Sequence, residues 1–214
     1  MNKSSAVILL DDDPSMRRSL SLALTLAGYE VQSYASAGEL FEALDPAQPG
    51  CLLLDLKMPG LDGLEVQEEL RARGCMLPVI FISAFADIPS TVRAMKAGAV
   101  DFVEKPFSKD ALVSRIEEAL ALDRRQRDHN GRRTDIADRV QQLTPRELEV
   151  MRFVTVGLSN KEIARELDIS PRTVEKYRAR VMEKMRAESI ADLCQMAAIL
   201  PDRAIPDQDS PGSA

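Results

Sequence analysis

Short apolar runs alternate with longer amphipathic stretches over the first 123 residues of the chain. Runs of four or five residues, bounded by polar or turn-forming residues, are typical of strands buried in a parallel sheet. They predict strands at Ala6–Leu10, Glu30–Tyr34, Cys51–Leu54, Pro78–Ile82 and Asp101–Glu104.

The stretches between and after these runs have the spacing of helices. In the first of them, about Pro14–Ala27, apolar residues recur at steps of four, three and four, at Met16, Leu20, Ala23 and Ala27. Further helices are predicted at about Ala37–Leu44, Gly63–Arg73, Pro89–Ala97 and Lys109–Leu122. Residues 1–123 therefore predict a doubly wound α/β domain with a five-stranded parallel sheet of order 2-1-3-4-5. Such domains bind ligands beyond the carboxyl ends of the strands.

The rest of the chain changes character. Charged residues dominate from Asp123 to Arg139, so we interpret residues 124–139 as a hydrophilic linker. The preceding helix could continue into its start, and His129-Asn130-Gly131 is the favoured point for a break. Residues 140–200 contain four helix starts with Ser or Thr N-caps, and they predict a small all-α, four-helix domain. The composition of residues 201–214 predicts a disordered tail. The four N-caps are Thr144, Ser159, Ser170 and Ser189.

Charge separates the two parts of the chain, whose overall net charge is −6. Residues 1–123 carry 11 Lys and Arg against 19 Asp and Glu, a net charge of −8. The segment Ser170–Arg186 carries six basic residues against two acidic ones, a net charge of +4. Such a basic segment suits a polyanionic partner.

The residue inventory excludes several functions. His129 is the only histidine, which excludes His-rich metal sites and Ser-His-Asp triads. A metal would have to be held by oxygens, which suits Mg²⁺. The three widely spaced cysteines are interpreted as reduced packing residues. With no recognisable signal peptide or apolar stretch of membrane-spanning length, no membrane association is expected and the cytoplasm is the expected location.

Polar side chains follow the predicted strands. Asp11 and Asp12 follow the first strand and Asp55 follows the third, and these strand ends are neighbours in the predicted order. Three carboxylates this close require a cation, for which Mg²⁺ is suited. Ser83 and Lys105 end the fourth and fifth strands. A hydroxyl, an ammonium and a metal around a carboxylate predict a phosphoryl-binding site that forms an aspartyl phosphate.

The segments LLDDDP, LLLDLKMPGLDG, FISA and DFVEKPF resemble, in this order, the signature blocks of response-regulator receiver domains over about residues 5–122. The resemblance implies that Asp55 takes a phosphoryl group from a sensor histidine kinase. It implies Mg²⁺ bound by Asp12 directly, with Asp11 assisting, and by the backbone carbonyl of Lys57.

Further roles follow from the same resemblance. Ser83 and Lys105 would contact the phosphoryl group, and Phe102 occupies the aromatic switch position. Lys105-Pro106 is expected to be a cis bond. Asp13, ahead of Pro14, suits an N-cap of the first helix.

The basic segment has two faces. A buried stripe is predicted at Val174, Tyr177, Val181 and Met185. The opposite face is basic in its N-terminal half and contains a small residue, as a helix that enters the major groove requires. The preceding helix, about Asn160–Leu167, joins it through a short connection typical of a helix-turn-helix.

The string LTPRELEVMRFVTVGLSNKEIARELDISPRTVEKYRARVMEKM resembles the LuxR-type DNA-binding domain, over about residues 140–199. The whole chain most resembles the FixJ/NarL class of two-component response regulators, with FixJ-like spacing. This implies base contacts from Glu175, Lys176 and Ala179. It implies phosphate contacts from Arg172, Thr173 and Arg180.

The expected function is therefore phosphorylation-controlled DNA binding and transcription regulation, with activation as the family default. Expected partners are a sensor histidine kinase, double-stranded DNA, RNA polymerase and a second copy of the chain. Dimerisation is expected on phosphorylation, through the fourth helix and fifth strand, with Val92 and Met95 as candidate contacts. We also expect the unphosphorylated acidic domain to inhibit the basic one.

Two alternatives remain open. One is a phosphatase with Asp55 as nucleophile, although such enzymes need a second acid where this chain has Lys57. We therefore expect only self-catalysed phosphoryl transfer and slow autodephosphorylation, which Phe85 is predicted to slow by shielding the phosphoryl group. The other is a protein-binding adaptor, against which the basic helix argues.

Overall fold

The structure, a computed structural model, describes residues 5–84 and 88–200. The predicted disorder of residues 201–214 and the predicted shielding by Phe85 lie outside the described residues. The chain divides into two compact units, Met1–Arg127 and Asp128–Ala214, which we call the N-terminal unit and the C-terminal unit.

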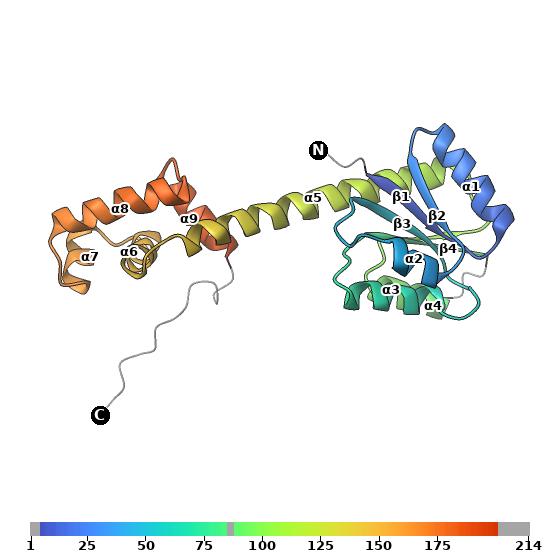
Figure 1. The fold of residues 1–214 in the computed structure, drawn as a ribbon, viewed down its shortest axis with the longest axis horizontal. Helices are drawn as coiled ribbons and strands as arrows, with labels where there is room; N and C mark the ends of the chain where they lie inside the picture. Colours follow the sequence, from blue (N-terminus) through green and yellow to red (C-terminus); the bar gives the residue numbers. More distant parts are fainter. Residues whose placement is uncertain (1–4, 85–87, 201–214) are drawn as a thin grey trace, which may run out of the picture. The chain divides into compact units, whose positions relative to one another are not determined.

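The N-terminal unit is built on a parallel sheet of five strands in the order β2-β1-β3-β4-β5 (Figure 1). This confirms the predicted fold class and strand order. The observed strands lie within two residues of the predicted bounds: β1 (Ala6–Leu10), β2 (Glu30–Tyr34), β3 (Gly50–Asp55), β4 (Val79–Ser83) and β5 (Asp101–Glu104).

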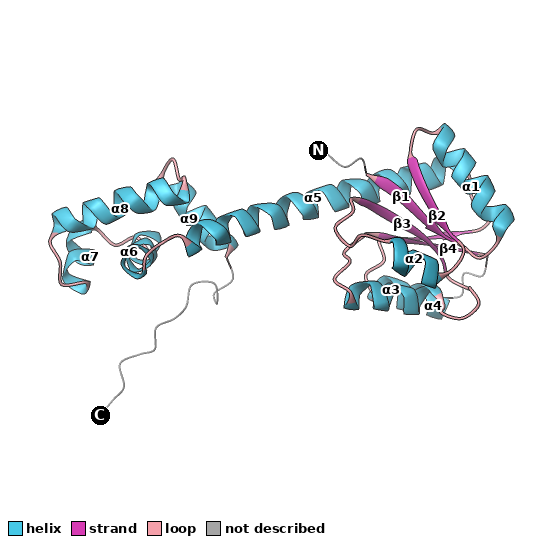
Figure 2. Cartoon of the chain, viewed as in Figure 1, coloured by secondary structure: helices cyan, strands magenta, loops and turns pink. Residues whose placement is uncertain are grey.

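Helices cover both faces of this sheet (Figure 2). On one face, α1 and the first turns of α5 pack on Val7, Leu9 and their neighbours. On the other, α2, α3 and α4 pack on Ile8, Leu54 and Phe81. Two faces covered by apolar side chains explain why β1, β3 and β4 are almost wholly buried. The helices are α1 (Pro14–Leu26), α2 (Ala37–Ala43), α3 (Gly63–Ala72), α4 (Ile88–Lys96) and α5 (Lys109–Gln141).

Helix α5 corrects the prediction of a break in the linker. It is 33 residues long and continues through His129-Asn130-Gly131. Both ends of the helix are anchored, since Ile116 packs in the N-terminal unit and Ile136 in the C-terminal unit. A glycine in a helix interior lowers helix stability by only about 1 kcal/mol relative to alanine. Packing on both sides of Gly131 outweighs this penalty, so the helix continues through it.

A polar clamp ties α5 to the chain that enters β3. Asp123, which is 2% exposed, accepts a hydrogen bond from the backbone N–H of Gly50 at 3.0 Å. Arg127 pairs with the Asp123 carboxylate at 2.8 Å and donates to the carbonyl oxygens of Ala47 and Gln48. Arg127, the fourth residue of the predicted linker, and Asp123, just before the linker, thus belong to the packing of the N-terminal unit.

As far as residue 200, where its described part ends, the C-terminal unit contains four short helices and the end of α5. All four predicted N-caps accept a backbone hydrogen bond at the start of their helix, which confirms them. Ile136 and Val140 of α5 join the apolar core, a contribution that the four-helix prediction did not include. The four helices are α6 (Pro145–Thr155), α7 (Asn160–Glu166), α8 (Pro171–Met185) and α9 (Ile190–Ile199).

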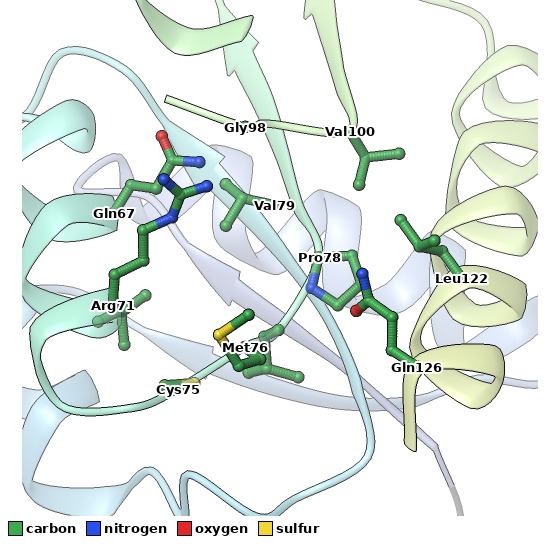
Figure 3. A pocket seen from close by; sticks show the side chains of 12 residues that line it. Gln67, Arg71, Cys75, Met76, Pro78, Val79, Gly98, Val100, Leu122 and Gln126 are labelled. Carbon is green, nitrogen blue, oxygen red and sulfur yellow. The ribbon is translucent and has the colours of Figure 1, made fainter. Parts of the chain in front are cut away.

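A cavity of about 90 Å³ lies at the amino ends of β4 and β5. Gln67 and Arg71 of α3 line one side, and Leu122 and Gln126 of α5 line the other (Figure 3). Its lining includes none of the residues that the sequence predicted for function. The predicted phosphoryl and metal site lies at the opposite, carboxyl ends of the strands. Within residues 5–84 and 88–200, no helix combines the length and apolar character that a membrane span requires.

Candidate functional site

The three predicted carboxylates converge at the carboxyl ends of β1 and β3. These strands are neighbours, with Leu10 paired to Leu54, so the residues that follow them come together. Carboxylate oxygens of Asp11, Asp12 and Asp55 all lie within 4.8 Å of one another. The convergence expected from strand order is therefore present.

Asp11 and Asp12 differ in their surroundings. Asp11 is 1% exposed, and both of its carboxylate oxygens are engaged by the protein. Its Oδ1 accepts from the backbone N–H of Asp13 at 2.8 Å, and its Oδ2 lies 2.9 Å from Lys105 Nζ. The Asp12 side chain, by contrast, is exposed. Asp13 caps α1 through the N–H groups of Ser15 and Met16, as predicted.

Lys105 and Ser83 come to the same site from β5 and β4. The Lys105 backbone N–H donates to the carbonyl oxygen of Ser83 at 2.8 Å, which joins the two strand ends. Lys105 Nζ lies 3.6 Å from Asp55 Oδ1. The Lys105–Pro106 bond is cis, as expected. Ser83 is 1% exposed, whereas Lys57 is exposed at the surface just after β3.

The electrostatics of the site favour an added cation. Burial raises the pKa of the Asp55 carboxyl, and the negative charges of Asp11 and Asp12 raise it further. Lys105 and the backbone N–H of Leu56 act in the opposite direction without reversing the shift. One ammonium against three carboxylates leaves excess negative charge among oxygen ligands, so the donor set fits a hard divalent cation such as Mg²⁺.

Gly63, the first residue of α3, passes very close to the end of β3. A Cβ at this position would lie 2.5 Å from the Asp55 carbonyl oxygen and 2.9 Å from the Phe81 ring. Only a glycine lets α3 start against this strand end without displacing it. Gly63 carries no signal in the sequence alone, because the close approach depends on where α3 packs.

Phe102 lies on β5, at the edge of the core. It is partly buried, and its ring stacks on Phe81 with the centroids 6.4 Å apart and the planes at 26°. Phe81 pairs with Phe102 across β4 and β5, so both rings are close to the strand ends that carry Ser83 and Lys105. This position is compatible with the predicted switch residue.

The second candidate surface is the exposed face of α8, which follows α7 after a short turn (Figure 1). Val174, Val181 and Met185 are buried, and Tyr177 packs against the same core, which confirms the predicted buried stripe. The opposite face carries the residues predicted to contact DNA. Thr173 is half-buried and its hydroxyl lies 2.8 Å from that of Ser170, and the other five are exposed: Arg172, Glu175, Lys176, Ala179 and Arg180.

Two basic residues of α8 have internal partners. Arg178 Nη1 donates to Asn160 Oδ1 at 2.9 Å and so ties α8 to the start of α7. Lys184 Nζ lies 2.6 Å from Glu147 Oε2 and 3.1 Å from the Gln142 carbonyl oxygen. The net charge of the segment alone did not distinguish these supporting residues from the exposed cations.

Two family descriptions match the chain, one for each unit. Residues 7–117 match the family described as response regulator receiver domain, and residues 141–197 match the bacterial regulatory proteins of the LuxR family. The two matches fall in the N-terminal and C-terminal units respectively.

Individual proteins resemble the chain over nearly its whole length. The transcriptional regulatory protein FixJ of Bradyrhizobium diazoefficiens is 43% identical over 197 residues, covering 92% of this chain and 96% of that protein. The response regulator protein TodT of Pseudomonas putida is 39% identical over 201 residues, covering 94% and 88%. The solved structure of the response regulator StyR is 40% identical with a TM-score of 0.83, covering 91% and 98%. That of full-length FixJ from B. japonicum is 42% identical with a TM-score of 0.58, covering 92% and 98%.

Proposed function

Because this chain belongs to the response regulators that join a receiver domain to a LuxR-type DNA-binding domain, and so acts in transcription regulation, we propose that Asp55 is its phosphoacceptor. The phosphoryl group comes from a sensor histidine kinase and controls DNA binding by the C-terminal unit. In this proposal residues 1–123 are the receiver, 124–139 the linker and 140–200 the DNA-binding domain. The observation that carries it is the convergence of three carboxylates with Lys105 Nζ 3.6 Å from Asp55.

The proposed reaction is a phosphoryl transfer. An Asp55 carboxylate oxygen forms a bond to phosphorus while the phosphorus–nitrogen bond of the kinase phosphohistidine breaks. Lys105 and the Ser83 hydroxyl contact the phosphoryl oxygens and hold the group in place. Mg²⁺ would be held by Asp12, Asp55 and the Lys57 carbonyl with Asp11 assisting, and it supplies positive charge to the phosphoryl oxygens.

The site supports transfer rather than turnover. Lys57, two residues after Asp55, is exposed and offers no carboxylic acid to protonate a leaving group. We therefore assign only self-catalysed phosphorylation and slow autodephosphorylation to Asp55, which disfavours the phosphatase alternative.

The C-terminal unit is proposed to bind double-stranded DNA through α8. Lys176, Glu175 and Ala179 contact bases, and Arg172, Thr173 and Arg180 contact phosphates. The exposed basic face supports this assignment over that of a protein-binding adaptor.

Phosphorylation is proposed to act through a second copy of the chain. Phe102 turns inward and α4 with β5 becomes the dimer surface, where Val92 and Met95 are each 44% exposed. The paired DNA-binding domains then recruit RNA polymerase as an activator. We further propose that the protein acts in the cytoplasm, where its DNA partner would be found.

Labelling with acetyl phosphate tests the proposal at Asp55. The wild-type chain should become phosphorylated in Mg²⁺ and not in EDTA, and Asp55→Asn should abolish labelling. Asp62→Asn is the matched control, because Asp62 is the N-cap of α3 and asparagine caps a helix equally well. Labelling that survives in Asp55→Asn or in EDTA would refute the site.

A further inference from the structure

Arg17, in the first turns of α1, donates hydrogen bonds to the loop that carries the two proposed metal-binding carboxylates. Its Nη1 donates to the carbonyl oxygen of Asp11 at 2.7 Å and to that of Asp12 at 2.9 Å. These carbonyls precede α1, which starts at Pro14, so they lie outside its ladder of helical hydrogen bonds. One guanidinium nitrogen therefore binds the carbonyl oxygens of two successive loop residues.

The peptide unit between Asp12 and Asp13 is held from both edges. In a planar trans peptide the carbonyl oxygen and the N–H point in opposite directions. Here the Asp12 carbonyl oxygen faces Arg17, while the Asp13 N–H donates to Asp11 Oδ1 at 2.8 Å. The orientation of this peptide plane is thereby fixed. The direction in which the Asp12 side chain points away from the backbone is fixed with it.

We propose that Arg17 is a positioning residue of the metal site, an inference that rests on the proposed function. By orienting the loop carbonyls, it keeps the carboxylates of Asp11 and Asp12 within 4.8 Å of the Asp55 carboxylate. Arg17 acts through the loop backbone and is itself no ligand. Partners that orient metal ligands in this way are typically worth 10- to 100-fold in metal affinity.

The sign of the effect separates positioning from simple electrostatics. Arg17 is a cation next to an acidic site, so its charge alone weakens the binding of a second cation. If Arg17 acted only through charge, its removal would strengthen metal binding. If it positions the loop, its removal weakens metal binding in spite of the more favourable charge.

The chain offers a matched control in Arg18, the next residue of α1, whose side chain is exposed. Arg18→Ala removes the same charge from the same helix turn and leaves the loop contacts in place. Arg17→Lys keeps the charge and one nitrogen donor. One donor can suffice, because a single nitrogen of Arg17 makes both contacts.

The experiment is a titration of the full chain with Mn²⁺, monitored by electron paramagnetic resonance. Binding is measured as the decrease in the signal of free Mn²⁺. We expect Arg17→Ala to bind Mn²⁺ about 10-fold more weakly than wild type. Arg18→Ala should bind as tightly as wild type or slightly more tightly, and Arg17→Lys should recover most of the loss. Thermal unfolding of each variant checks its fold, and Arg17→Gln replaces Arg17→Ala if the alanine variant does not fold.

The titration distinguishes a failure of the proposed metal site from a failure of the positioning role of Arg17. If wild type does not bind Mn²⁺, or if Asp12→Ala binds it as well as wild type, the proposed metal site itself is wrong. If wild type binds Mn²⁺ at that site and Arg17→Ala binds it as tightly as Arg18→Ala, only the positioning role of Arg17 is overturned.

Discussion

At the scale of single residues, the exposed face of α8 allows base reading to be separated from phosphate contact. Lys176 and Arg180 are both exposed on this face, one turn apart. Lys176→Ala should lower operator affinity and relax base discrimination, since a base-edge contact is worth about 1–3 kcal/mol. Arg180→Ala should weaken operator and random DNA alike and lower the salt slope by about one unit. Titrations of both DNAs at several salt concentrations measure this, and equal effects of the two variants on the two DNAs would contradict the assignment.

Glu147 links α6 to α8 inside the C-terminal unit and should make its stability depend on pH. Burial alone would raise the pKa of Glu147, but hydrogen bonds from Lys184 and Thr144 hold the pKa below its usual range. A lowered folded-state pKa gives stability that is complete above the unfolded-state pKa and is lost as the pH falls through the folded-state pKa. The loss should therefore be seen in acid, beginning below about pH 4.5.

Glu147→Gln should remove this part of the acid destabilisation. Hydrogen–deuterium exchange of α6 and α8 in the intact chain, measured across the acidic range, reports it. Glu149→Gln is the control, because Glu149 pairs with Arg146 at the surface, where such pairs contribute little. If both variants keep the wild-type pH dependence, the Glu147–Lys184 pair is not its source.

At the scale of elements, α5 shows how anchoring at both ends overrides a weak local preference. A Cβ at Gly131 would meet nothing within 4 Å, so alanine fits there without a clash. Gly131→Ala should stabilise the middle of α5 by about 1 kcal/mol and slow amide exchange around it about fivefold.

The matched control has the opposite sign. Gly157, after α6, also has open space around it, but its φ of +91° disfavours any side chain. Gly157→Ala should therefore accelerate exchange at the end of α6. If Gly131→Ala leaves the amide exchange of α5 unchanged, Gly131 does not limit the stability of the helix in this region.

At the scale of the whole molecule, the control of DNA binding depends on what the N-terminal unit does before phosphorylation. A fragment of residues 128–214 keeps Ile136 and Val140 in the C-terminal core, so it should fold alone. We expect this fragment to bind operator DNA without phosphate and the intact Asp55→Asn chain to bind it poorly. Gel-shift titrations compare them. If the fragment binds no better than the intact unphosphorylated chain, inhibition by the N-terminal unit is wrong and dimerisation alone must account for control.

Much of this molecule could be read from local patterns in the sequence. The strands, the N-caps and the buried stripe of α8 depend on the identities of residues a few positions apart, which the chain itself sets. The convergence of Asp11, Asp12 and Asp55 required one further step, because strand order makes the ends of β1 and β3 neighbours. The candidate site was therefore predictable as a set of residues.

Only the tertiary structure decided which side chains support that set. Arg17 and Arg18 are adjacent cations, and only the path of α1 shows that Arg17 reaches the loop carbonyls. Gly63 matters through its closeness to β3, and α5 stays helical because packing at both ends outweighs a local penalty. These features depend on distances between elements, which are set by packing. Two residues of the same type, such as Arg17 and Arg18, therefore differ in role according to the elements that lie beside them.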